Sequence, residues 1–102
     1  MIIATENELA IVQDIIRNFA PDCAVLVFGS RFSSGAERQP KKYSDLDLAF
    51  IPAGAALGMR RLSQLALAFS ESDLPYRVDV VDYNSASPEF QTIIDSANEK
   101  IW

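Results

Sequence analysis

The 102-residue sequence contains no histidine. Histidine is the side chain whose charge most readily changes near neutral pH, and it is a common metal ligand. Its absence excludes Ser–His and Cys–His nucleophile pairs, histidine zinc sites and histidine acid–base catalysis. Any catalysis must therefore rest on carboxylates, hydroxyls, backbone amides, lysine, arginine or a bound metal ion.

Cysteine is nearly absent as well, because Cys23 is the only one and no internal disulfide can form. A single thiol fits a reducing cytoplasm, or simply a small buried side chain. No apolar run approaches the roughly 18 residues that a membrane-spanning helix needs. The N-terminus also lacks the basic region and apolar block of a signal peptide. We therefore expect a cytoplasmic protein with no membrane partner.

Basic residues are too few to balance the acidic ones, with 9 Lys and Arg against 14 Asp and Glu and a net charge of −5. An acidic chain is repelled by a phosphate backbone, so direct nucleic-acid binding is disfavoured, although a local basic loop could offset this. Neither the P-loop nor the dinucleotide-binding glycine motif occurs. The length and the 49% of hydrophobic residues fit one domain, residues 1–102.

The hydrophobic residues that are present follow helical and strand periods in alternation. Thr5 and Glu8 form a capping box at the first helix, and Ser87 followed by Pro88 is typical of the start of the last one. This alternation predicts an α/β fold, with a small mixed sheet of three to four strands flanked by helices. The predicted elements are a helix from Thr5 to before Pro21, strands 24–28, 43–51 and 76–82, a helix over 59–69, and a helix from Pro88 whose apolar face continues to Ile101.

Two aspartates interrupt the second predicted strand. Asp45 and Asp47 are two residues apart and so project from the same face. Asp79 lies within the third strand and joins them if that strand pairs beside the second. Such close carboxylates repel each other, and a divalent cation such as Mg²⁺ relieves the repulsion. Three carboxylates can hold two metal ions about 3.5–4 Å apart, as in nucleotidyl transfer. The Asp-x-Asp pair alone equally fits a solvated strand edge.

Two other features have competing interpretations. Gly29 and Ser30 close the first strand, where a glycine and a serine can approach a phosphate closely, or can form an ordinary strand-to-helix turn. Asp82 ends the third strand and is followed by the turn-like residues Tyr83-Asn84-Ser85, which predicts a surface carboxylate. The loop charges Arg38, Lys41 and Lys42 are either a solvated cluster or a contact for a triphosphate.

Taken together, the Gly-Ser turn after a strand, the Ser-Asp-Leu-Asp-Leu run and a later strand bearing Asp79 resemble the nucleotidyltransferase superfamily that includes DNA polymerase β. The small size is similar to the minimal nucleotidyltransferases, and the resemblance covers essentially the whole chain. Gly29, Ser30, Asp45 and Asp47 match the family pattern residue by residue, and Arg31 after the serine is usual in the minimal group. The loop departs from the pattern, because Gly35 comes one position late and AERQPKK lengthens the polar run.

The resemblance implies a mechanism. Gly29, Ser30 and Arg31 bind the phosphates of a nucleotide triphosphate, with ATP as the substrate. Asp45, Asp47 and Asp79 ligate Mg²⁺, two ions in all, and are the catalytic residues. Asp79 also helps to deprotonate the attacking hydroxyl, and pyrophosphate leaves.

Minimal nucleotidyltransferases are typically paired with a helical HEPN-family protein, and this resemblance implies the partner. Such pairs behave as type VII toxin–antitoxin systems, in which the antitoxin transfers AMP to a tyrosine of the RNase toxin. Two alternatives remain at this point: a catalytically idle antitoxin that inhibits by binding alone, or an enzyme acting on a small molecule or a tRNA end. The C-terminal Trp102 is either a contact surface for the partner or part of the core.

Overall fold

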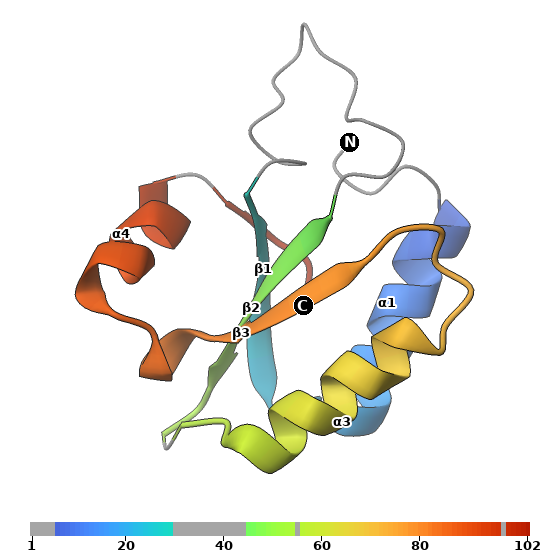
Figure 1. The fold of residues 1–102 in the computed structure, drawn as a ribbon, viewed down its shortest axis with the longest axis horizontal. Helices are drawn as coiled ribbons and strands as arrows, with labels where there is room; N and C mark the ends of the chain where they lie inside the picture. Colours follow the sequence, from blue (N-terminus) through green and yellow to red (C-terminus); the bar gives the residue numbers. More distant parts are fainter. Residues whose placement is uncertain (1–5, 30–44, 55, 97) are drawn as a thin grey trace, which may run out of the picture.

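The computed structural model describes residues 6–29, 45–54, 56–96 and 98–102. Helices and strands alternate along most of this length, as the sequence predicts (Figure 1). The expected cap at Thr5 and the first residues of the expected strand 43–51 lie outside the described residues. The elements are α1 (Glu6–Phe19), β1 (Cys23–Phe28), β2 (Leu46–Pro52), α3 (Met59–Ser70), β3 (Val78–Asp82), the 3-10 turn η1 (Tyr83–Ser85), α4 (Pro88–Ser96) and β4 (Glu99–Lys100).

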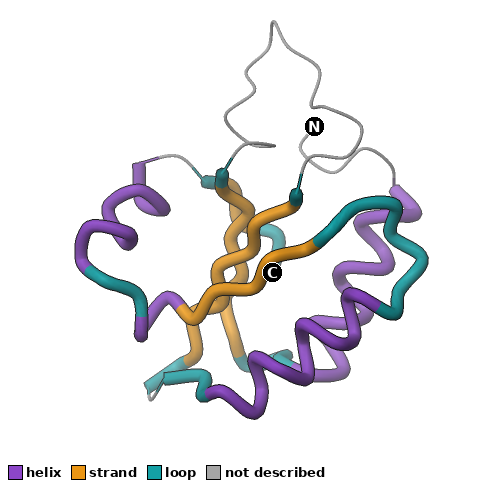
Figure 2. Tube along the Cα trace, viewed as in Figure 1, coloured by secondary structure: helices purple, strands orange, loops and turns teal. Residues whose placement is uncertain are grey.

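The four strands form one mixed sheet in the order β3-β2-β1-β4. β1 pairs antiparallel with β2 and with β4, whereas β2 and β3 run parallel. A parallel pair needs a crossover connection, and α3 supplies it between β2 and β3. As a result, the C-terminal end of β1 and the N-terminal ends of β2 and β3 lie together at one end of the sheet (Figure 2).

Helices cover the two faces of the sheet unequally. α1 and α3 lie together over one face, and α4 lies over the other (Figure 1). The larger core lies under α1 and α3, where alternate residues of β1 and β2 are fully buried against Ile16 and Leu65. Each such buried aliphatic side chain contributes roughly 1.5–3 kcal/mol through apolar burial. On the α4 face the core is small, with Phe28, Ala49 and Ile94 at its centre.

The last helix starts as the sequence predicts but ends earlier. The Phe90 N–H donates to the Ser87 hydroxyl at 3.2 Å, which confirms the predicted cap. The expectation that the helical face runs on to Ile101 is wrong, because α4 ends at Ser96 and the chain returns as β4. The Ile101 N–H donates to the Val25 carbonyl at 2.9 Å, so sheet hydrogen bonds replace the expected last helical turn.

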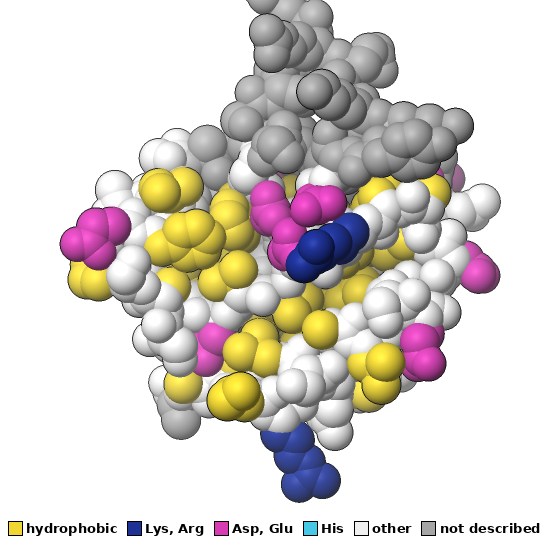
Figure 3. Space-filling view, in the orientation of Figure 1, with side chains coloured by type: hydrophobic (Ala, Val, Ile, Leu, Met, Phe, Trp, Pro, Cys, Tyr) yellow, Lys and Arg dark blue, Asp and Glu magenta, His cyan; other side chains and the backbone are white. Residues whose placement is uncertain are grey.

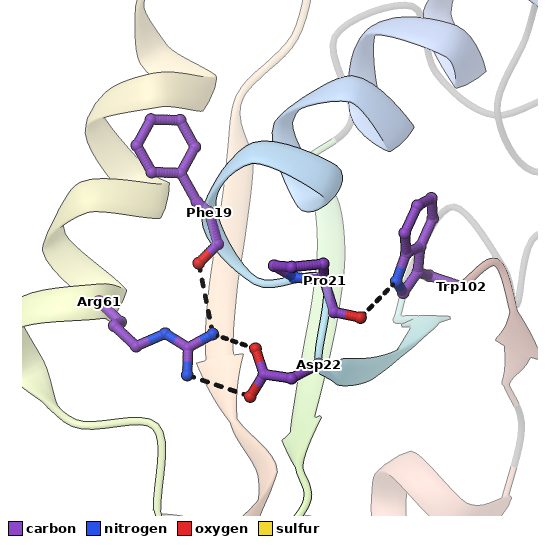
Figure 4. Close-up of polar contacts among 5 residues, drawn as sticks. All are labelled: Phe19, Pro21, Asp22, Arg61 and Trp102. Carbon is purple, nitrogen blue, oxygen red and sulfur yellow. Dashed lines mark hydrogen bonds and ion pairs between the residues drawn. The ribbon is translucent and has the colours of Figure 1, made fainter.

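The C-terminus closes against the first helix and strand. Trp102 packs against the main core, and its indole N–H donates to the Pro21 carbonyl at 3.2 Å (Figure 4). Beside it, Arg61 of α3 forms a two-point ion pair with Asp22, at 2.6 and 3.3 Å, and also donates to the Phe19 carbonyl. The Arg61 guanidinium lowers the pKa of the Asp22 carboxyl. Of the two interpretations of Trp102, the folded-back one is therefore correct.

No helix in the described ranges is long and apolar enough to cross a bilayer. Cys23, at the start of β1, is buried and carries a free thiol.

Candidate functional site

The candidate site lies on the α4 face of the sheet, at the end of the sheet where β1 ends and β2 and β3 begin. α4 packs on the part of this face around Ala49 and Ile94. Figure 3 shows acidic side chains gathered near the start of β2 and β3, beside a basic side chain. The site therefore combines this end of the sheet with the carboxylates that the sequence pattern singled out.

The register places the predicted carboxylates side by side. Asp47 of β2 is the Cα partner of Asp79 of β3, and directly opposed residues of neighbouring strands project from the same face. Asp45 precedes β2 and is two residues from Asp47, which again gives the same face. On its other side, Asp47 is the partner of the buried Phe28 in β1. The sheet thus holds Asp47 between an aromatic ring and a second carboxylate.

This surrounding raises the pKa of the Asp47 carboxyl from 3.8 to about 6. Burial is the largest cause, followed by the negative charges of Asp79 and Asp45 and a hydrogen bond with Asp79. Burial and the neighbouring charges both disfavour the ionised form. Burial removes water from the carboxylate, and the nearby negative charges repel it. Among the described residues, no basic side chain forms an ion pair with Asp47 that would offset this penalty.

Gly29 makes room for Asp47. The backbone φ at Gly29 is 84°, a conformation that residues with a Cβ atom rarely adopt. A Cβ atom there would also collide with the Asp47 carboxylate, with 2.9 Å to its Cγ atom. Gly54 and Gly58 share the positive φ but have nothing within 4 Å of a Cβ position. Close approach to a carboxylate is therefore specific to Gly29, and it explains this glycine without reference to a phosphate.

Asp79 already has one cationic neighbour. Its carboxylate oxygen lies 3.1 Å from the Arg77 Nε atom, and the Arg77 side chain is 76% exposed. An exposed ion pair of this kind contributes only about 0–1 kcal/mol. The pair therefore holds Asp79 weakly and leaves it able to turn toward another cation.

The donor chemistry of the site fits a hard divalent cation. Three carboxylates on one face supply the oxygen ligands that Mg²⁺ prefers, and the raised pKa of Asp47 reflects the charge that such an ion would neutralise. Within the described residues, however, no three acidic, cysteine or histidine side chains are already arranged around a common point. Binding would therefore require the carboxylates to turn toward the ion.

The prediction that Asp82 is a surface carboxylate is wrong. Asp82 is 5% exposed and accepts hydrogen bonds from the Leu57 N–H at 2.9 Å, the Asn84 N–H at 3.2 Å and the Ser85 hydroxyl at 2.8 Å. The turn composition after it was correctly recognised, but the turn folds over the carboxylate instead of exposing it. Asp82 points to the α1 and α3 side, because it alternates with Val81 along β3. It is a structural residue and does not join the site.

The other predicted phosphate-binding residues, Ser30 and Arg31, lie outside the described residues, as do Arg38, Lys41 and Lys42. Phe28 is a site residue that the sequence reasoning missed. It was assigned only to a buried strand, yet its register opposite Asp47 makes it one wall of the carboxylate cluster. Strand alternation together with the antiparallel register would have identified it.

Comparisons with known proteins agree with this geometry. A family model described as "Polymerase beta, Nucleotidyltransferase" matches residues 11–102. The probable protein adenylyltransferase MntA of Haemophilus influenzae is 48% identical over 88 residues, which span 86% of this chain and 73% of that protein.

Several solved structures that this chain resembles are toxin–antitoxin complexes. One, crystallised with AMP-PNP, has a TM-score of 0.72 at 25% identity and covers 92% of this chain and 72% of the matched chain. Another is a tri-AMPylated Shewanella oneidensis HEPN toxin in complex with an MNT antitoxin, with a TM-score of 0.66 at 24% identity, covering 92% of this chain and 68% of that one. The second match, at its lower identity, shows a shared fold only.

Proposed function

The chain belongs to the polymerase β nucleotidyltransferase family, and from this premise we propose that it transfers AMP from ATP to a hydroxyl of a HEPN-family toxin. The observation that carries the proposal is the pairing of Asp47 with Asp79 on one face, with Asp45 beside them. The similarity to a probable protein adenylyltransferase supports a protein as the acceptor. The similarity to a complex with AMP-PNP supports an adenine nucleotide as the donor.

We assign the carboxylates separate roles. Asp45 and Asp47 would hold Mg²⁺, and Asp79 would help to hold a second ion. Bound Mg²⁺ would supply positive charge that offsets the triphosphate and the departing pyrophosphate. Gly29 keeps the backbone clear of the Asp47 carboxylate, so the ligand oxygens remain accessible. Ser30 and Arg31 would bind the outer phosphates, as the family resemblance implies.

We assign the proton transfer to Asp79. Its side chain is 37% exposed on the outermost strand, which supports access by an incoming hydroxyl. The hydroxyl proton passes to Asp79 as the hydroxyl oxygen bonds to the α-phosphorus. The bond between that phosphorus and the bridging oxygen of the β-phosphate breaks, and pyrophosphate leaves with the electron pair. Modification of a toxin tyrosine in this way would neutralise the toxin, which makes this chain the antitoxin of the pair.

The experiment that tests this function weighs the acceptor. The chain is incubated with ATP, Mg²⁺ and the product of the neighbouring open reading frame, which the proposal expects to be a HEPN protein, and that product is analysed by intact mass and peptide mapping. We expect a gain of adenylate on a tyrosine, and no gain with the Asp45→Asn variant. The matched control is Asp14→Asn, since Asp14 is exposed on α1 and pairs only with Arg17.

Two outcomes would contradict the proposal. Neutralisation of the toxin by the Asp45→Asn variant, without any mass gain in the wild type, would show inhibition by binding alone. Transfer of adenylate to a small molecule or a tRNA end, with the HEPN protein unmodified, would show that the acceptor is not a protein.

A further inference from the structure

The outer edge of β3 has unused hydrogen-bonding groups. β3 is the outermost strand of the sheet, and it pairs only with β2 among the described residues. The Leu46 N–H donates to the Arg77 carbonyl at 2.9 Å, which fixes the direction of the alternating backbone groups. The N–H and C=O groups of Val78 and Val80 therefore point away from β2. Such an open edge is a template for an added strand.

A groove of about 480 Å³ runs along this edge, between β3 and the C-terminal half of α3. Phe69 and Leu74 line it together with Val78 and Val80, so one wall is apolar. Asp79 lines the same groove and also belongs to the carboxylate cluster. Asp79 is therefore shared by the groove and the candidate site, and a chain lying along this edge would pass beside it.

The turn of residues 71–73, which joins the lining residues Ser70 and Leu74 and is called the rim here, is acidic. Glu71 and Asp73 are exposed in the turn between α3 and β3, and no ion pair of either is found within the described part of the chain. Arg77 is the basic residue that lines the groove, and it already pairs with Asp79. The uncompensated charge at the rim would attract a basic segment and repel an acidic one.

We propose that this groove is the docking site for the acceptor segment of the partner protein, which binds as an extended, basic strand added to the outer edge of β3. The inference rests on the proposed function, because it explains how the acceptor hydroxyl reaches Asp79. Side chains of a strand alternate between faces. The hydroxyl residue of the segment faces Asp79, and the residues directly before and after it are apolar and face Phe69 and Leu74.

Blocking the groove from its exposed wall tests the proposal. Ala66 is exposed on α3 and lines the groove, whereas the next residue, Leu67, is 59% exposed and does not line it. Ala66→Trp and Leu67→Trp therefore place the same side chain inside and outside the groove. Fluorescein-labelled peptides of about 15 residues, tiled over the HEPN protein, are titrated into the full chain and followed by anisotropy.

We expect a basic peptide with a tyrosine between apolar residues to bind the wild type. Ala66→Trp should weaken its binding by about tenfold or more, and Leu67→Trp by less than about twofold. Failure of every peptide to bind, or equal effects of the two substitutions, would overturn the proposal. Thermal unfolding of each variant establishes that it is folded before titration.

A second measurement uses the unmodified protein. Hydrogen exchange is followed by NMR for the amides of Val78 and Val80, with Asp79 and Val81 as internal references because their N–H groups face β2. The bound peptide should slow the first pair by about tenfold or more and leave the reference pair nearly unchanged. Unchanged exchange at Val78 and Val80 would overturn the added strand.

The two proposals fail in different ways. A peptide that protects Val78 and Val80 but never receives adenylate from ATP and Mg²⁺ would refute the proposed function and support the docking site. Transfer of adenylate to the HEPN protein with no protection at β3 would support the function and refute the docking site.

Discussion

The two ends of β3 hold aspartates in opposite circumstances. At the C-terminal end, Asp82 is buried and accepts three hydrogen bonds from groups of the protein itself. At the N-terminal end, Asp79 is half-exposed, faces Asp47, and among the described residues has an ion pair only with the exposed Arg77. The same residue type, three positions apart on one strand, thus accepts several internal hydrogen bonds in one place and faces a like charge in the other.

The difference separates a structural carboxylate from a functional one. Burying a charged group is costly unless hydrogen bonds compensate it, and the turn after β3 supplies that compensation for Asp82. At the N-terminal end of β3, the cost of ionising a partly buried carboxylate remains in the folded protein, as the raised pKa of Asp47 indicates. Such stored electrostatic strain is expected where a ligand provides the missing charge. Four predictions test this contrast, in order of decreasing effect.

The largest effect should come from Asp47→Asn, which removes a proposed Mg²⁺ ligand but keeps the shape of the side chain. We expect the rate of adenylate transfer to fall by at least about 1,000-fold, or about 4 kcal/mol in the activation barrier. The folded state should be retained, since the substitution removes like-charge repulsion. The rate is measured by incorporation of labelled AMP. A variant that keeps a tenth of the wild-type rate would remove Asp47 from the catalytic site.

The next effect concerns stability at the other end of β3. Asp82→Ala leaves the buried Leu57 N–H and two part-buried donors of the following turn without their acceptor, and we expect it to lower the free energy of unfolding by about 3 kcal/mol. Urea unfolding measures the change. Asp14→Ala, at an exposed ion pair on α1, serves as the control and should cost less than about 1 kcal/mol. Equal losses in both variants would mean that the hydrogen bonds of Asp82 are not important for stability.

A pair of glycine substitutions isolates the contact at the site. Gly29→Ala and Gly58→Ala both place a Cβ atom at a positive φ, but only the first collides with Asp47. We expect Gly29→Ala to cost about 1–2 kcal/mol more stability than Gly58→Ala. In an Asp47→Ala background most of the difference should disappear, because only the Asp47 Cβ atom, at 3.2 Å, remains of the colliding side chain. A difference of undiminished size in that background would point to another cause.

The smallest effect is a pH dependence of the metal-free protein. The pKa of Asp47 is about 6 in the folded state, above its ordinary value of 3.8, so the folded state binds the proton more tightly than the unfolded one. Stability should therefore fall as the pH rises from about 4 to about 7. Without solvent screening, the shift of about two pKa units would correspond to about 3 kcal/mol. Screening at this half-buried side chain reduces the expected fall to about 1 kcal/mol.

The measurement is urea unfolding in EDTA across this pH range, for the wild type and for Asp47→Asn. Subtracting the variant isolates the contribution of Asp47 from those of the other acidic groups. Mg²⁺ should restore stability more at pH 7.5 than at pH 5, since the carboxylate is ionised only at the higher pH. A flat difference curve would contradict the raised pKa.

The sequence pattern found the carboxylates of the site because strand alternation is a local property. The two-residue spacing of Asp45 and Asp47 requires them to share a face wherever the strand lies in the fold. The exposure of Asp82 was wrongly predicted because the residues after it, Tyr83-Asn84-Ser85, show only that a turn follows. They do not show on which side of the carboxylate the turn closes. β4 was missed because Glu99 and Lys100 are two exposed polar residues without a strand pattern, and only pairing with β1 makes them a strand.

By itself, then, the sequence determined the alternation of helices and strands and the faces on which side chains project, because both follow from the near-neighbour geometry of the backbone. The tertiary structure alone decided that β2 and β3 lie parallel and in a register that sets Asp47 against Asp79. It also decided that the absence of a Cβ atom at Gly29 leaves room for the Asp47 carboxylate, and that β3 pairs on one side only among the described residues. Contacts of this kind join residues that are distant along the chain, and they form only when the apolar faces of the sheet and helices pack together.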